Sequence, residues 1–82
     1  MEILLSKNAI KFLKKQELNV STRMRTALKG LLEIPPIGDI KKMKGMENTY
    51  RLRVGTYRIV YTIDYQKEVV QILTIDNRGD IY

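Results

Sequence analysis

The pattern of apolar and polar positions in the first part of the chain predicts one strand followed by a helix. Residues 2–5 form an apolar run that is short enough for a single β-strand. Ser6 follows, and its hydroxyl can cap a helix by accepting a hydrogen bond from a free backbone N–H. Ala9 and Leu13 then recur at helical spacing among lysines, and this pattern fades near residues 18–19.

A longer apolar stripe predicts a second helix. Its members recur at the spacing of one helix face: Val20, Met24, Ala27, Leu28, Leu31 and Leu32. Asn19 or Ser21 could cap its start. Pro35 and Pro36 should stop it, because proline cannot donate the helix hydrogen bond and restricts the residue before it. Gly30 weakens it by about 1 kcal/mol relative to alanine. Two helices so close in sequence should form an antiparallel hairpin.

The remaining chain changes from helical to alternating spacing after residues 37–49, which we expect to form a basic loop. Residues 50–54 and 57–63 alternate between apolar and polar side chains, and residues 68–75 are mostly apolar and β-branched. Residues 55–56 have the length of a tight hairpin turn, with glycine where a positive φ is favoured. The order strand, helix, helix, strand, strand, strand predicts an α+β fold, with the helical hairpin on one face of a small antiparallel sheet whose edge the first strand joins.

The charge of the chain favours a polyanionic partner. Its 82 residues include 15 Lys and Arg against 9 Asp and Glu, which gives a net charge of +6. Such a surplus attracts phosphate backbones without reading their sequence, so we expect contact with nucleic acid or the ribosome. The length and a hydrophobic fraction of 44% predict a single domain over residues 1–82, with one modest core.

Cysteine and histidine are both missing from the sequence. This excludes a disulfide framework, a thiolate metal site and an imidazole acid or base. No metal-ligand cluster is visible, and we expect no cofactor. The sequence has no apolar run of membrane-spanning length and no signal-peptide pattern, so we expect a cytoplasmic protein that does not contact the membrane.

Three arginines share one face of the predicted hairpin. If residues 55–56 form a two-residue turn, Arg53 faces Arg58 across the strands and Arg51 shares their face. Like charges placed opposite each other destabilise a sheet, and no acidic residue occurs within 48–63. We therefore expect something outside the chain to supply negative charge, and phosphate suits the fork of guanidinium donors. The alternative is that the arginines simply mark a solvated outer face.

Residues on either side of the hairpin extend its basic character. Lys41, Lys42 and Lys44 are candidate contacts to a substrate RNA or to ribosomal RNA. Near the C-terminus, Arg78 and Tyr82 combine a cation with an aromatic ring, which is the usual platform for an unstacked base. Taken alone, a terminal tyrosine is as easily explained by simple packing or fraying.

The hairpin and the C-terminal segment together resemble a known family. The segments YRLRVGTYRIVY at 50–61, NRGDIY at 77–82 and KMKG at 42–45 resemble the signature of the RelE/ParE toxin superfamily. The resemblance implies a RelE-like β-α-α-β-β-β domain and a type II toxin that has a cognate antitoxin. It points to the RelE-like branch, in which the toxin enters the ribosomal A site and cuts mRNA. The ribose 2′-hydroxyl attacks the adjacent phosphate, a reaction that needs no metal.

The resemblance also implies roles for individual residues. Arg51 and Arg53 match two basic residues of the family on the strand before the turn. Arg58 matches the arginine that stabilises the transition-state phosphate, and Arg78 matches an arginine near the leaving oxygen. Tyr82 matches the terminal tyrosine that stacks on the flipped base. In-line phosphoryl transfer depends largely on such positioning and charge neutralisation.

Two departures from the family bear on this chemistry. Many relatives have histidine where this chain has Asn77, and RelE has lysines where it has Arg51 and Arg53. Arginine cannot act as a base, because its guanidinium stays protonated at biological pH. The attacking hydroxyl therefore needs another base, which could be Asp39, Glu47, a group on the ribosome or water.

Two other functions stay open at this point. The ParE-like branch, whose members poison DNA gyrase, shares the hairpin motif, although ParE members usually have longer helices and a longer C-terminal tail. An inactive member, kept as an antitoxin-binding module, is suggested by the arginine replacements and the missing histidine.

Overall fold

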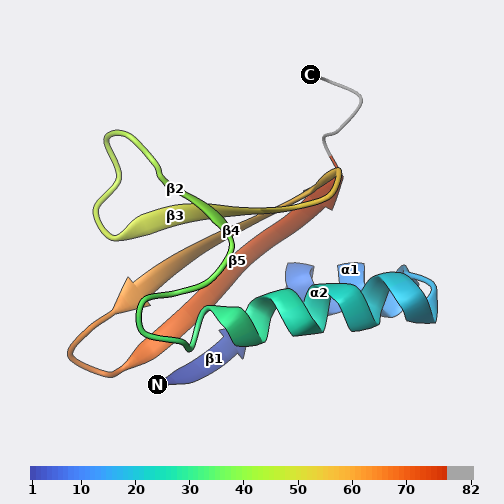
Figure 1. The fold of residues 1–82 in the computed structure, drawn as a ribbon, viewed down its shortest axis with the longest axis horizontal. Coiled ribbons are helices and arrows are strands. Elements are labelled where there is room, and N and C mark those ends of the chain that lie inside the picture. The colour runs from blue at the N-terminus through green and yellow to red at the C-terminus, as the bar shows by residue number, and fades with distance from the viewer. Residues whose placement is uncertain (78–82) are drawn as a thin grey trace.

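The computed structural model describes residues 1–77, which form two helices and one five-stranded sheet. In chain order the elements are β1 (Glu2–Leu5), α1 (Lys7–Lys15), α2 (Leu18–Gly30), β2 (Asp39–Lys42), β3 (Thr49–Val54), β4 (Tyr57–Asp64) and β5 (Val69–Asn77). Both helices lie on one side of the sheet, and α2 runs back alongside α1 (Figure 1). The predicted α+β fold, with a helical hairpin on a small sheet, is confirmed.

The strands follow the order β1-β5-β4-β3-β2. All neighbours are antiparallel except β1 and β5, which run parallel. The first strand therefore joins the edge of the antiparallel meander, as predicted. The β3–β4 hairpin also has the predicted turn, since Gly55 has a φ of 60° and Val54 pairs with Tyr57. Arg53 consequently pairs with Arg58.

Ser6 caps helix α1 as the sequence predicted. The backbone N–H of Ala9 donates to Ser6 Oγ at 3.1 Å, which satisfies one of the free donors at the helix start. The same hydroxyl donates to the carbonyl of Leu73 at 2.7 Å. One serine therefore fixes both the beginning of α1 and its position over strand β5.

The predicted cap of helix α2 is wrong. The helix begins at Leu18, so the break between the two helices falls at residues 16–17, and Glu17 occupies the N-cap without a side-chain hydrogen bond. Asn19 and Ser21 lie inside the first turns, where the Ser21 hydroxyl donates to the carbonyl of Leu18. The apolar stripe starts later than the helix because Leu18, the first helical residue, points into solvent.

Helix α2 ends at Gly30, well before the two prolines that were predicted to stop it. The backbone N–H of Ile37 donates to the Gly30 carbonyl at 2.9 Å, so the returning chain takes the acceptor that a continuing helix would use. A Cβ built on Gly30 would lie 2.9 Å from the Ile37 carbonyl oxygen, which only glycine avoids. The apolar stripe extends past this point because Leu31 is buried in the turn that follows the helix.

The segment predicted as a basic loop contains a strand, which corrects the expectation for residues 37–49. Strand β2 pairs antiparallel with β3 along its whole length, and Ile40 lies opposite Leu52. Ile40 is the only apolar residue in this four-residue strand, so the segment carries no alternating pattern of its own. Pairing with the open edge of β3 makes it a strand, as expected for a short, charged edge strand.

The core lies between the helices and the near face of the sheet. Its buried members are Ala9, Leu13, Met24, Leu28, Leu31, Leu52, Ile59, Tyr61, Val70, Ile72 and Ile75. Tyr61 is the largest fully buried side chain, and its ring stacks on Tyr50 with centroids 5.5 Å apart. Burial raises the pKa of the Tyr61 phenol to about 12, because the charged form loses solvation. Within residues 1–77, neither helix has the length and apolar character needed to cross a membrane.

Candidate nucleic-acid interface

The sheet face turned away from the helices carries a cluster of charged side chains. We call it the arginine face, and its members are Asp39, Lys41, Arg51, Arg53, Arg58 and Asp76. The register places them together because each lies opposite another member across a strand pair. Alternate residues of the same strands, such as Leu52 and Ile59, enter the core. One face of the sheet therefore packs in the core, and the other face carries the charged side chains.

Two aspartates balance part of the arginine charge. Asp39 Oδ1 lies 3.8 Å from Arg51 Nη2, and Arg58 Nη2 donates to Asp76 Oδ2 at 3.4 Å. This corrects the expectation that compensating charge comes only from outside the chain, since both carboxylates come from neighbouring strands. Four cations and two carboxylates still leave the arginine face positive. Asp76 orients the Arg58 guanidinium by a hydrogen bond, whereas Asp39 lies near Arg51 without one and reduces its charge only in part.

Arg51 has a donor that the described residues do not use. Its Nη1 atom is buried and has no hydrogen-bond partner within residues 1–77, although Nη2 lies near Asp39. A buried N–H group without a partner costs about 1–3 kcal/mol, and more when the group is charged. Such a donor is well suited to an oxygen of a bound anion. The side chain of Arg51 is only 16% exposed, so a ligand would meet a preoriented group.

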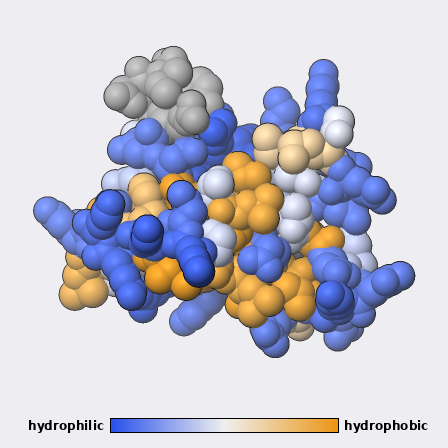
Figure 2. All heavy atoms as spheres, turned by 180° about the vertical axis from the view of Figure 1, so that it is seen from behind, coloured by the Kyte–Doolittle hydropathy of each residue, from blue (hydrophilic) through white to orange (hydrophobic). Residues whose placement is uncertain are grey.

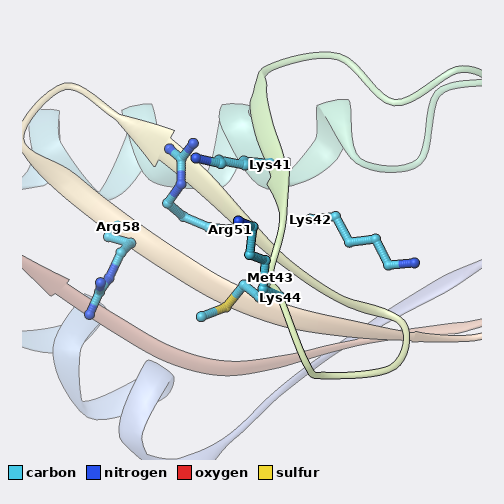
Figure 3. Close-up of a pocket in the computed structure, with 6 residues that line it drawn as sticks. All are labelled: Lys41, Lys42, Met43, Lys44, Arg51 and Arg58. Carbon is cyan, nitrogen blue, oxygen red and sulfur yellow. The ribbon is translucent and has the colours of Figure 1, made fainter.

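A pocket of about 370 Å³ opens beside these arginines (Figure 3). Its lining residues are Lys41, Lys42, Met43, Lys44, Arg51 and Arg58. Strand β2 and the loop after it form one wall, and strands β3 and β4 form the floor. The Lys42 side chain extends away from the arginines in Figure 3, because its register partner Tyr50 belongs to the other face of the sheet. None of the lining residues within 1–77 is acidic, so this part of the pocket is suited to an anion.

The structure brings together most of the residues that the sequence singled out. Arg51 and Arg58 line the pocket with all three predicted lysines, and Arg53 lies on the same face with an exposed side chain. Arg78 and Tyr82 lie outside the described residues, so their predicted roles rest on the sequence. Asn77 ends strand β5 opposite Tyr57, on the rim of the sheet next to the hairpin turn.

The two carboxylates considered as a base differ in position. Asp39 belongs to the arginine face, and its side chain is 59% exposed beside Arg51. Glu47 lies in the loop before β3, where its backbone carbonyl accepts a hydrogen bond from the Thr49 hydroxyl. Of these two candidates, Asp39 is the one that the fold places beside an arginine of this face. No group of three or more acidic, His or Cys side chains that could hold a metal occurs within residues 1–77.

Asp76 is a site residue that sequence reasoning missed. The β4–β5 register shifts between Val60 and Tyr61, so that Tyr61 pairs with Ile72 and Val60 with Thr74. This bulge reverses the alternation of the last part of β5, and it turns Asp76 toward Arg58. Simple alternation from Ile72 would have put Asp76 on the core face. The one available signal was that a carboxylate is disfavoured in a core.

A sequence model of the ParE toxin family, described as the ParE toxin of the type II toxin–antitoxin system parDE, matches residues 3–82. The chain belongs to this toxin family. The RelE/ParE toxin is thus recognised both by its hairpin motif and by a match along nearly all of its length.

The toxin is also similar to RelE proteins in sequence and structure. Toxin RelG of Mycobacterium tuberculosis is 46% identical over 37 residues, which cover 45% of this chain and 42% of RelG. The matched segment thus spans less than half of that relative. The archaeal RelE–RelB complex of Pyrococcus horikoshii OT3 has a chain with a TM-score of 0.78 and 26% identity, over 95% of this chain and 94% of that one. A chain of the RelBE2 toxin–antitoxin complex of M. tuberculosis has a TM-score of 0.75 and 28% identity, over 94% of this chain and 96% of that one. The expected RelE-like fold is confirmed.

Proposed function

We propose that this toxin is a ribosome-dependent mRNA endonuclease that inhibits translation in the cytoplasm. The observation that carries the proposal is the cationic pocket in which Arg51 and Arg58 meet the lysines of β2 and the following loop. A single-stranded message offers the polyanion that such a pocket lacks, and the RelE relatives have the same fold.

The proposed reaction is attack of a ribose 2′-hydroxyl on the adjacent phosphate. Arg58 and Arg51 neutralise the charge that grows on the phosphate oxygens, with the unused Nη1 of Arg51 as one donor. Lys41 and Lys44 hold the neighbouring backbone phosphates. Asp39, a ribosomal group or water takes the 2′-hydroxyl proton as the 2′-oxygen bonds to phosphorus. The bond from phosphorus to the 5′-oxygen breaks, and this oxygen receives a proton from water or a ribosomal group, so the products carry a 2′,3′-cyclic phosphate and a 5′-hydroxyl.

Two further residues complete the proposed site by their sequence match. Arg78 neutralises the leaving oxygen, and Tyr82 stacks on the base that the message presents in the A site. Arg53 supports binding from the exposed part of the arginine face, next to the hairpin turn. The chemistry assigned to these residues is positioning and charge neutralisation, and it requires no metal or cofactor.

We also propose a cognate antitoxin as the protein partner. The similar RelE chain from P. horikoshii was solved in complex with RelB. This toxin keeps apolar surface exposed, including Leu18, Ile34 and Ile37, and Figure 2 shows apolar patches among polar side chains on the face seen from behind. Exposed apolar patches and a basic face are both typical of surfaces that bind a protein partner. The antitoxin segment should be apolar or acidic where it contacts the toxin.

A second candidate function is inhibition of DNA gyrase. The family model that matches residues 3–82 is described as ParE, which favours this candidate. Toxin RelG matches in sequence and the P. horikoshii RelE chain matches over nearly the whole fold, which favours the mRNA endonuclease. Accumulation of gyrase–DNA cleavage complexes with intact message would support the second candidate.

The deciding experiment is a reconstituted translation reaction in which message ends are mapped by primer extension. Wild-type toxin is added with and without ribosomes, beside Arg58→Ala and the control Arg25→Ala, which removes an exposed arginine of α2. We expect cuts only with ribosomes, a loss of about 10²–10³-fold in rate for Arg58→Ala and little change for the control. Intact message in every lane, or equal cutting by both variants, contradicts the proposal.

A further inference from the structure

Arg23 of helix α2 lies against the turn that joins strands β3 and β4. A Cβ built on Gly55 would lie 2.5 Å from Arg23 Nη2 and 3.3 Å from its Cζ. The Arg23 guanidinium therefore lies over the turn, on the side where any residue other than glycine would carry its Cβ. The φ of 60° at Gly55 is the feature that favours glycine at this position.

The charge of Arg23 is not balanced locally. No hydrogen bond or ion pair joins Arg23 to another residue within residues 1–77, whereas Arg51 and Arg58 each have an aspartate beside them. Helix α2 itself contains no acidic residue. An arginine that is placed on a turn without an acid is a candidate for an external anion.

The same turn ends the two strands that carry Arg53 and Arg58. These residues pair with each other one step before the turn, since Val54 and Tyr57 form the last pair. Arg23 approaches the turn from the helix side of the sheet, and the other two arginines lie on the arginine face. The tip of the hairpin is therefore flanked by guanidinium groups on both sides, and only a thin glycine-containing turn separates them.

From this arrangement we infer that Arg23 binds a backbone phosphate of single-stranded RNA, at the point where the strand passes around the β3–β4 turn. Successive phosphates of an extended RNA strand can contact both sides of a narrow turn, and each contact relieves repulsion among the arginines. The inference rests on the proposed function, because it extends the RNA path beyond the pocket of Arg51 and Arg58 to helix α2.

The matched control is Arg25→Ala. Arg25 is an exposed arginine on the same helix, and two helical positions turn a side chain by about 200°, away from the hairpin. Arg23→Ala and Arg25→Ala change the net charge equally, so a difference between them reports position rather than charge. Both residues are exposed, so thermal unfolding of each variant should match that of the wild type.

The test measures binding of a short fluorescein-labelled oligouridine by anisotropy across a series of salt concentrations, without ribosomes. We expect Arg23→Ala to weaken binding about fivefold at low salt and to reduce the slope of log affinity against log salt by about 0.7, the value for one single-strand phosphate. Arg23→Lys should keep most of the slope, and Arg25→Ala should follow the wild type.

Superimposable salt curves for Arg23→Ala and Arg25→Ala would overturn the inference, as would wild-type toxin that fails to bind the oligouridine. Message cleavage on ribosomes is scored separately with wild-type toxin. If the wild type cuts message and Arg23→Ala binds RNA normally, the inference about Arg23 is wrong and the proposed function stands. If the wild type binds RNA through Arg23 but does not cut message, the proposed function is wrong and the inference about Arg23 stands.

Discussion

The two faces of the sheet are built from alternate residues of the same strands, yet they respond to different physical demands. Arg58 and Ile59 are neighbours in β4, and one side chain reaches the pocket while the other is fully buried beneath the helices. On the helix-covered face, removal of apolar area from water stabilises the fold. On the arginine face, like charges are brought together at a cost to stability. Along one strand, the residues that stabilise the core therefore alternate with the residues for which we propose a role in RNA binding.

The largest expected effect that separates the faces is on stability. Ile59→Ala removes a fully buried side chain and should lower the free energy of unfolding by about 3 kcal/mol. Arg58→Ala, one residue away, should lower it by less than about 1 kcal/mol, because the partly exposed pair with Asp76 contributes little. Urea unfolding followed by circular dichroism measures both. Equal losses would mean that the arginine face is part of the stabilising structure.

The pH dependence of stability should show how strongly the helix-covered face of the sheet resists the ionisation of Tyr61. Burial raises the pKa of Tyr61 to about 12 from an ordinary value of 10.0. The folded state thus binds the phenolic proton more tightly than the unfolded state. The stability contributed by the protonated Tyr61 phenol is therefore complete below pH 10. As the pH rises toward 12, the free energy of unfolding should fall by roughly 2–3 kcal/mol in total.

The control for this titration is Tyr61→Phe, which removes the ionising group and keeps the buried ring. The variant should lose stability less steeply between pH 10 and 12 than the wild type, as measured by urea unfolding at a series of pH values. Parallel curves for the two proteins would show that the Tyr61 phenol is not the group that resists ionisation.

The smallest effect is expected from an acid on the arginine face. Asp76→Asn removes the carboxylate that accepts the hydrogen bond from Arg58 and makes this face more positive. RNA affinity at low salt should rise about fivefold, while the free energy of unfolding should change by less than about 1 kcal/mol. Anisotropy with the labelled oligouridine and urea unfolding provide the two readouts. Weaker RNA binding would mean that Asp76 acts mainly by orienting Arg58.

Several features of this toxin were determined by the sequence alone. The alternation in β3 and β4, together with a glycine at the first position of a two-residue turn, was sufficient to predict the Arg53–Arg58 pair. Ser6 followed by apolar residues at helical spacing was sufficient for α1 and its cap. These features depend on residues only a few positions apart, so local propensity and turn geometry dictate them.

Other features were decided only by the tertiary structure. Strand β2 exists because β3 offers an unpaired edge, and helix α2 ends where Ile37 returns to the Gly30 carbonyl. A bulge between β4 and β5 turns Asp76 to the arginine face, and the position of α2 sets Arg23 on the hairpin turn. Each of these depends on a contact between two segments that the chain brings together by turning back on itself, from seven residues apart at the end of α2 to more than thirty between Arg23 and Gly55. No local pattern encodes such a contact, because its free energy arises only when the two segments meet.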